Sequence, residues 1–235
     1  MHLPRGKRDH VAIVNSHGRN NSQTIHYGDI ETNYTLDKAR VTKRTAGMVV
    51  NFATKLPPEE RDHVVFRYPK MVLGVGDKEC EFLRTRHERF KELFPNLKLL
   101  ERAEIAGLEP NLVEGRRKEE PIVALGALDE YSAVNYTTLS EAFVDQAQKS
   151  AAAKHMRCDV FLSTAVERIV EEDGCFKVRT PNRGTLTARY VVVSAGGHSL
   201  LFAHQMGYGL DKSCLPMAGS FWPSLLIACT LMRPT

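Results

Sequence analysis

The most constraining stretch of this 235-residue sequence is Tyr190–Ser199, in which an apolar run leads directly into two adjacent glycines. Tyr190–Val193 predicts the end of a buried strand, and Gly196 and Gly197 predict a sharp turn after it. Ligands of open α/β sheets bind at the carboxyl ends of strands, where glycines let the backbone approach a phosphate or a flat ring. A tight turn between a core strand and a helix explains the same residues at least as well. The stretch therefore predicts a layered sheet and leaves its role open.

The rest of the chain alternates between predicted helices and predicted strands. Helix-compatible spacing of apolar residues begins after Thr35 and ends at Pro57, and Thr138–Glu141 has the form of a capping box that opens a later helix. A charged helix is predicted over 78–93, strands over 11–14, 71–75, 97–100, 158–161 and 186–193, and hairpin turns at 173–174 and 182–184. This order favours a mixed α/β (α+β) fold, with helices layered on sheets, over a bundle or a sandwich.

A second signal is the polar stretch Gly18–Ile30, which is dense in neutral hydrogen-bonding side chains and contains one imidazole, His26. Such a loop can offer donors to the carbonyl and nitrogen atoms of a heterocycle. Composition alone favours a solvated loop. The residues of this stretch do not decide between the two interpretations.

Charge and cysteine usage exclude several classes of function. The net charge is +4, but the Lys and Arg residues are interleaved with Asp and Glu, so no nucleic-acid partner is predicted. The five cysteines are odd in number and widely spaced, and they form no C-x-x-C motif. No disulfide framework and no metal site are therefore expected, and the pattern suits a reducing compartment. Gly74 and Gly76 begin like a dinucleotide fingerprint, but Glu79 stands where the third glycine belongs.

Several motifs together resemble one family. Asn20–Ile30 resembles the "NSxxIHxG" loop of the D-amino-acid-oxidase-like flavoprotein superfamily. With Gln23-Thr24 inside it and Glu31–Thr35 after it, the loop is similar to that of the malate:quinone oxidoreductases in particular. The same family pattern appears in 68–76, 127–130, 195–199, 206–210 and 214–221. The resemblance extends from about Val11 to Phe221.

This resemblance implies an enzyme that oxidises (S)-malate to oxaloacetate, with FAD as the hydride acceptor and a quinone as the final electron acceptor. It implies a partial FAD-binding, Rossmann-like domain interleaved with an antiparallel-sheet substrate domain. The segments expected are 1–56 and 126–205 in the FAD domain, 57–125 in the substrate domain, and 206–235 as the start of a second substrate-domain segment with an unrelated tail. A location on the cytoplasmic side is implied, and peripheral attachment to the inner membrane stays open.

The resemblance also assigns roles to single residues, each by its position in the matching motif. The residues near the isoalloxazine ring would be Asn21, Ser22, Gln23, Thr24 and His26. Ala195, Gly196 and Gly197 would approach the pyrophosphate–ribityl side, and the backbone of Val166 would contact adenine. His26 is also a candidate catalytic base, although its place in the loop supports flavin contact better than proton abstraction.

The sequence departs from the family pattern at both ends. The strand, G-x-G-x-x-G turn and helix that hold the pyrophosphate have no counterpart, and resemblance stops after Phe221. We therefore expect a chain truncated at both ends, with weak or no activity. Two alternatives are a related flavin-dependent dehydrogenase, of the L-2-hydroxyglutarate or glycerol-3-phosphate type, and a non-catalytic truncated scaffold.

Overall fold

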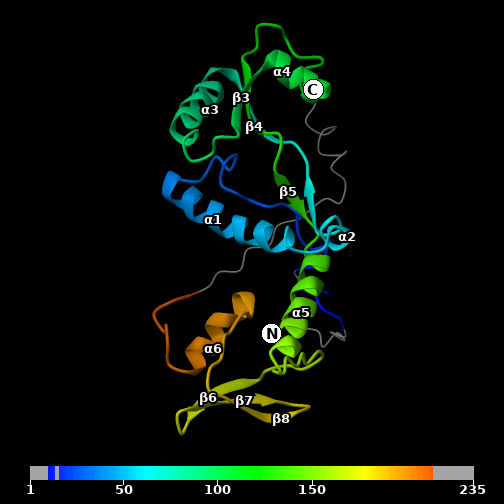
Figure 1. Cartoon of the computed structure of the whole chain (residues 1–235). Coiled ribbons are helices and arrows are strands. Elements are labelled where there is room, and N and C mark those ends of the chain that lie inside the picture. The colour runs from blue at the N-terminus through cyan, green and yellow to red at the C-terminus, as the bar shows by residue number, and fades with distance from the viewer. Residues whose placement is uncertain (1–9, 14–15, 214–235) are drawn as a thin grey trace. The chain divides into compact units, whose positions relative to one another are not determined.

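The computed structural model describes residues 10–13 and 16–213 (Figure 1). The fold divides into two compact units, one extending from Ala12 to Gln146 and the other beginning at Ala147. The larger helices are α1 (Leu36–Ala53), α3 (Gly76–Phe90) and α5 (Tyr136–Ala153), and the shorter ones are α2 (Pro58–Arg61), α4 (Arg102–Leu108), η1 (Pro110–Leu112), η2 (Gly196–His198) and α6 (Ser199–Gln205). The strands are β1 (Val65–Arg67), β2 (Lys70–Val75), β3 (Leu97–Glu101), β4 (Ile122–Ala127), β5 (Tyr131–Val134), β6 (Arg168–Glu172), β7 (Cys175–Thr180) and β8 (Gly184–Ala188).

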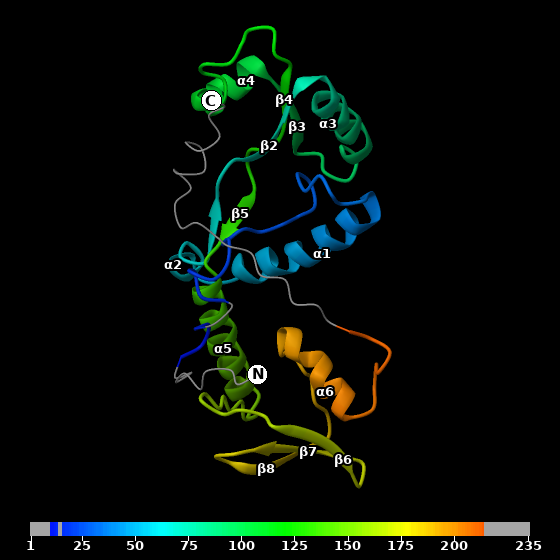
Figure 2. The same cartoon turned by 180° about the vertical axis from the view of Figure 1, so that it is seen from behind.

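A three-stranded antiparallel sheet, in the order β2-β4-β3, organises the first unit. Helices α3 and α4 lie on opposite sides of this sheet (Figures 1 and 2). Successive side chains of a strand point to opposite faces. Val123 and Leu125 therefore pack into the cluster that contains α3, whereas Ile122 and Ala124 pack into the cluster that contains α4. Because both faces are covered, every residue of β4 is buried.

A second, two-stranded sheet pairs β1 with β5 in antiparallel fashion. Helix α1 begins after Thr35, whose side chain accepts a hydrogen bond from the backbone N–H of Lys38. Its buried positions are Ala39, Ala46 and Ala53, which repeat every two helical turns and so lie on one face. Ala46 and Ala53 pack with β1 and β5, whereas Ala39 packs into the cluster around α3. Small side chains on α1 therefore join the two sheets of this unit.

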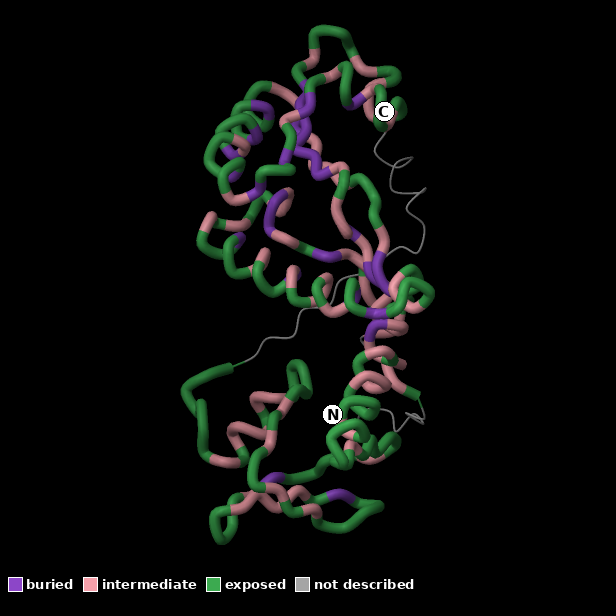
Figure 3. The backbone as a smooth tube through the Cα atoms, in the orientation of Figure 1, coloured by how far each residue is buried: buried purple, intermediate pink, exposed green. Residues whose placement is uncertain are grey.

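The second unit contains the sheet β6-β7-β8. Its first hairpin turns at Asp173 and Gly174, which have φ values of 53° and 69°, as a type I′ turn requires. Only Ile169 and Thr180 are buried among the described residues of this unit (Figure 3). Its apolar core is therefore much smaller than that of the first unit.

Four expectations about local structure are wrong. The described residues 11–13 form a turn and a bend, not a strand. Residues 158–161 also form no strand, and the strand predicted over 186–193 ends at Ala188, with Tyr190 and Val192 about nine-tenths exposed. Helix α5 begins at Tyr136, earlier than the predicted capping box, because the Asn135 side chain accepts hydrogen bonds from the backbone N–H groups of Thr137 and Thr138.

The predicted mixture of helices and sheets is confirmed. Every pairing among the described strands is antiparallel, so the Rossmann-like part of the fold prediction stays a prediction. The division into four segments of FAD domain and substrate domain also stays a prediction.

Candidate functional site

The loop that contains most of the predicted site residues is fixed to the edge of β5. Thr24 forms an antiparallel bridge with Ala133, Ile25 donates its backbone N–H to Ser132 O at 2.9 Å, and Val134 donates to Gln23 O at 2.9 Å. Ile25 is buried in the core with Val65 and Val134. The loop therefore has a defined path and is not simply solvated.

The amide side chains of this loop serve the loop itself. Asn21 Oδ1 accepts from the backbone N–H of Gln23 at 2.9 Å and from Gln23 Nε2 at 2.6 Å. Gln23 Oε1 accepts from the backbone N–H of Tyr136 at 3.2 Å, at the start of α5. Gln23 adopts a positive φ of 53°, a conformation that this network stabilises. Asn21 and Gln23 thus hold the backbone that carries Ser22 and Thr24.

Ser22 and Thr24 carry the aliphatic hydroxyl groups of the loop. Ser22 is exposed, and the Thr24 hydroxyl donates to Ser22 O at 3.0 Å. The backbone carbonyl of Thr24 accepts from the Tyr136 hydroxyl at 3.1 Å. Burial raises the pKa of Tyr136, so its hydroxyl stays protonated and a donor at neutral pH.

His26 and Glu31 form a close pair. His26 Nδ1 lies 2.7 Å from Glu31 Oε1, and the other carboxylate oxygen accepts the backbone N–H of Gly28, also at 2.7 Å. The His26 side chain is 53% exposed, whereas that of Glu31 is 14% exposed. The pKa of His26 is raised, mainly by its hydrogen bond to Glu31. An imidazole with one nitrogen held by a carboxylate is thereby presented at the surface.

Two features fix the backbone beneath this pair. Gly28 has a φ of +93°, and a Cβ there would lie 2.8 Å from Ala39 Cα, so a side chain at this position would be both strained and blocked. The buried Arg86 of α3 donates to three carbonyl oxygens: Glu31 O at 2.7 Å, Tyr34 O at 2.9 Å and Gly28 O at 3.3 Å. It makes no ion pair with a carboxylate in the part of the chain described, and burial lowers its pKa. The turn from 28 to 34 is therefore clamped by a buried cation.

A buried group of charges lies next to the loop. Lys70 Nζ is 2.9 Å from Asp29 Oδ1 and 2.9 Å from Glu130 Oε1, the second contact having ion-pair distance without hydrogen-bond geometry. The ammonium also lies 4.8 Å from the centre of the Tyr27 ring. Two carboxylates facing one lysine leave an excess negative charge.

The protonation of this group follows from its burial. Burial lowers the pKa of Lys70, but Asp29 and Glu130 outweigh it, so the net shift is upward and the lysine stays charged. The pKa of Glu130 is raised, mainly by burial and further by the neighbouring Asp29 carboxylate, against the opposing effect of Lys70. Burial and the two carboxylates raise the pKa of Tyr27 to about 12. The group thus pins Asp29, and with it the loop, to β2.

The remaining predicted residues lie in the second unit. Val166 is 39% exposed and lies just before β6. Ala195 leads into η2, and its backbone N–H donates to Ser199 Oγ at 2.9 Å. Gly196 has a φ of +56°, and no atom lies within 4 Å of a Cβ built at Gly196 or Gly197. The turn is therefore open to a group that approaches its backbone.

Sequence reasoning missed the supporting residues Asp29, Glu31, Lys70, Arg86 and Glu130. Asp29 lies within the polar stretch and Glu31 directly follows it, and acidic residues close to a candidate base were a signal for the His26 partner. Lys70 and Arg86 gave no such signal, because their partners lie 41 and 52 or more positions away in the sequence.

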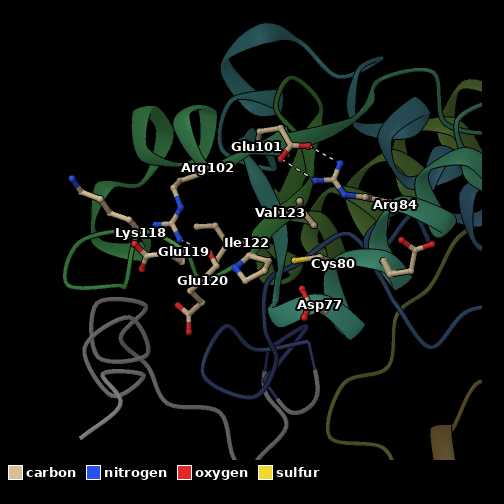
Figure 4. A pocket seen from close by; sticks show the side chains of 12 residues that line it. Asp77, Cys80, Arg84, Glu101, Arg102, Lys118, Glu119, Glu120, Ile122 and Val123 are labelled. Carbon is tan, nitrogen blue, oxygen red and sulfur yellow. Dashed lines mark hydrogen bonds and ion pairs between the residues drawn. The ribbon is translucent and has the colours of Figure 1, made fainter.

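A separate surface pocket contains none of the predicted residues. It has a volume of about 520 Å³ and is lined by charged side chains of α3, β3, α4 and the segment before β4 (Figure 4). Arg84 points to Glu101 across it, with two hydrogen bonds of 2.6 and 3.0 Å. No group of acidic, histidine and cysteine side chains that could hold a metal ion occurs within residues 10–13 and 16–213.

The likeness to solved structures concerns the fold. Glycine oxidase from Geobacillus kaustophilus superposes with a TM-score of 0.57 at 16% identity, covering 80% of this chain and 48% of that one. L-Proline dehydrogenase from P. horikoshii gives a TM-score of 0.56 at 18% identity, covering 77% and 44%. At such identities the fold is shared and nothing further is shown.

The likeness in sequence is more specific. A probable malate:quinone oxidoreductase of Campylobacter jejuni is 41% identical over 222 residues, which are 92% of this chain and 48% of the relative. A malate:quinone oxidoreductase of Helicobacter pylori is 39% identical over 221 residues, again 92% and 48%. The chain thus spans about half the length of these relatives. The family pattern of Malate:quinone oxidoreductase (Mqo) matches residues 5–224. The chain belongs to the malate:quinone oxidoreductase family.

Proposed function

We propose that this protein takes part in the oxidation of (S)-malate to oxaloacetate, with FAD as the hydride acceptor and a quinone as the final electron acceptor. The observation that carries the proposal is the family match over nearly the whole chain, because it includes the loop with His26 and the turn with Gly196 and Gly197. Both matched relatives above bear the name of this activity. No matched relative above is named for the L-2-hydroxyglutarate or glycerol-3-phosphate alternative.

The residues of the two predicted segments fit a flavin. The open turn at Gly196 and Gly197 leaves room for a phosphate or ribityl group against the backbone, because no atom is near a Cβ at either position. On the loop, Ser22, Thr24 and His26 would face the ring, while the amides of Asn21 and Gln23 hold the loop in shape. Val166 would lie against adenine. Bound FAD supplies an acceptor for the hydride that leaves the carbinol carbon of malate.

The chain's own contribution to the chemistry is proton transfer. When the C–H bond of malate is broken, its electron pair leaves with the hydride, and the hydroxyl proton needs an acceptor. We assign this acceptor to Nε2 of His26, since Nδ1 is engaged with Glu31 and half of the side chain is exposed. A raised pKa strengthens the neutral imidazole as a base. The four-segment domain division and peripheral attachment to the inner membrane belong to the same proposal.

Within the described residues, no helix has both the length and the apolar character needed to traverse a lipid bilayer. In the proposal, electrons pass to a quinone dissolved in the membrane at a surface of the protein. The proposal places that surface on the cytoplasmic side.

Anaerobic reduction of flavin tests the proposal. The purified chain is incubated with excess FAD, and its visible spectrum is recorded after addition of (S)-malate, L-2-hydroxyglutarate or glycerol 3-phosphate in separate samples. Because weak activity is expected of this chain, we expect partial bleaching of the flavin band with (S)-malate alone, and less bleaching in a His26→Gln variant. Bleaching by one of the other two substrates, or no bleaching by malate, would contradict the proposal.

A further inference from the structure

We infer that Glu31 is a positioning residue, which holds His26 in the tautomer with the proton on Nδ1 and leaves Nε2 free to accept a proton. The inference rests on the proposed function, in which His26 takes the hydroxyl proton of malate. It adds a second residue to the site and gives the physical reason that Nε2, and not Nδ1, accepts the proton.

The orientation of Glu31 is set by the backbone and not by His26 itself. One carboxylate oxygen accepts the N–H of Gly28 at 2.7 Å, which leaves the other oxygen for His26 Nδ1, also at 2.7 Å. A carboxylate has only acceptors to offer, so at a hydrogen-bond distance the proton must be on Nδ1. In neutral His26, Nε2 then carries a lone pair.

The backbone of Glu31 is held in place as well. Its own carbonyl oxygen accepts from Arg86 at 2.7 Å, and the positive φ of Gly28 turns the chain so that residues 28 and 31 face each other. Arg86 also donates to Gly28 O. Both ends of this short turn are thus attached to α3, and the carboxylate is presented to His26 in one geometry.

The charges around His26 act on its pKa in both directions. Lys70, on β2, lowers the pKa of His26, whereas Glu31 and Asp29 raise it, and burial lowers it. The contact that remains decisive is the hydrogen bond to Glu31, which is the largest contribution to the upward shift. Asp29 and Lys70 are themselves paired with each other, at 2.9 Å.

A merely structural role for Glu31 would tie the loop together without selecting a nitrogen. Glu31→Gln separates the two possibilities. The amide oxygen must still accept the Gly28 N–H, because an amide nitrogen there would set donor against donor. The amide NH₂ group would then face His26 Nδ1, which would have to act as acceptor, and the proton would move to Nε2.

The experiment is ¹⁵N NMR of the histidine side chains in the full chain, at a pH about two units above the ordinary histidine pKa of about 6.5. His26→Gln identifies the His26 signals, and Glu88→Gln, beside His87, is the control for loss of an acidic neighbour of a histidine. Protonated and unprotonated ring nitrogens of neutral imidazole resonate far apart. We expect Nδ1–H in the unchanged protein and in Glu88→Gln, and Nε2–H in Glu31→Gln.

An Nε2–H tautomer or an even mixture in the unchanged protein would overturn the inference, and this result does not depend on whether any variant folds. An unaltered tautomer in a folded Glu31→Gln protein would overturn it as well. No FAD or malate is present in this measurement. A result that contradicts the inference is therefore distinguishable from a result that contradicts the proposed function, which is tested by malate-dependent bleaching.

Discussion

Replacement of Arg86 by methionine should destabilise the first unit strongly, because one buried side chain satisfies three backbone carbonyl groups. In the unchanged protein, the guanidinium carbon of Arg86 lies 3.8 Å from the centre of the Phe90 ring. Methionine keeps an unbranched, apolar side chain over this ring. It removes the hydrogen bonds to Glu31 O, Tyr34 O and Gly28 O. The perturbation therefore tests the clamp and leaves most of the packing in place.

The size of the effect follows from two opposing contributions. A hydrogen bond from a charged donor contributes about 1.5 kcal/mol or more, and a buried acceptor left without a partner costs about 1–3 kcal/mol. Against this, Arg86 is only 5% exposed and has no carboxylate partner among the described residues, so its removal relieves a desolvated charge. The cost of leaving three carbonyl groups without a donor exceeds the gain from removing one buried charge. We therefore expect the free energy of unfolding to fall by about 3 kcal/mol, a large part of the usual stability of a domain.

Urea unfolding followed by far-ultraviolet circular dichroism measures this loss. The matched control is Arg89→Met, on the same helix, because Arg89 is exposed and should change the free energy of unfolding by no more than about 0.5 kcal/mol. The slope of the free energy against urea should be the same in all three proteins, so that the midpoints can be compared. An Arg86→Met protein as stable as the Arg89→Met control would refute the clamp.

Three further predictions concern single positions. Asn135→Ala should destabilise the protein by about 1 kcal/mol through loss of the cap of α5, whereas Thr138→Ala should have little effect. Thermal melts measure both changes, and a larger loss in Thr138→Ala than in Asn135→Ala would show that the predicted capping box opens the helix instead. Gly28→Ala should lower the melting temperature more than Gly76→Ala, since both have positive φ but only Gly28 has a backbone carbon of α1 at 2.8 Å from a new Cβ; equal shifts would contradict this. The raised pKa of His26 contributes stability that is complete below the unfolded value of about 6.5 and is lost as pH rises through the folded value. The difference in unfolding free energy between the unchanged protein and His26→Gln should therefore shrink as pH rises, and a constant difference would exclude this linkage.

Local signals in the sequence predicted local structure well. The hairpin at Asp173 and Gly174 was predicted correctly, because an Asp-Gly pair readily adopts the positive φ values that its turn requires. The spacing of apolar residues likewise predicted α1, because its buried alanines repeat on one helical face. The cap of α5 was misplaced, since Asn135 and Thr138 are both good capping residues and only the geometry selects between them.

Long-range pairing was harder to predict. Tyr190–Val193 is β-prone, but a strand requires a hydrogen-bonded partner, and none pairs with it among the described residues. For the candidate site, the loop and the glycine turn were recognisable as motifs. The groups that hold the loop in place, such as Lys70 and Arg86, come from other elements and became evident only from the fold.

The most direct test of the assignment is to map FAD binding on the chain by amide NMR. The proposal assigns FAD contacts to the loop from Asn21 to His26 and to the turn from Ala195 to Gly197. Titration with FAD should shift the amide signals of both segments with the same dissociation constant, and leave those around Arg84 in the charged pocket unchanged. Shifts in one segment alone, or shifts centred on that pocket, would contradict the assignment.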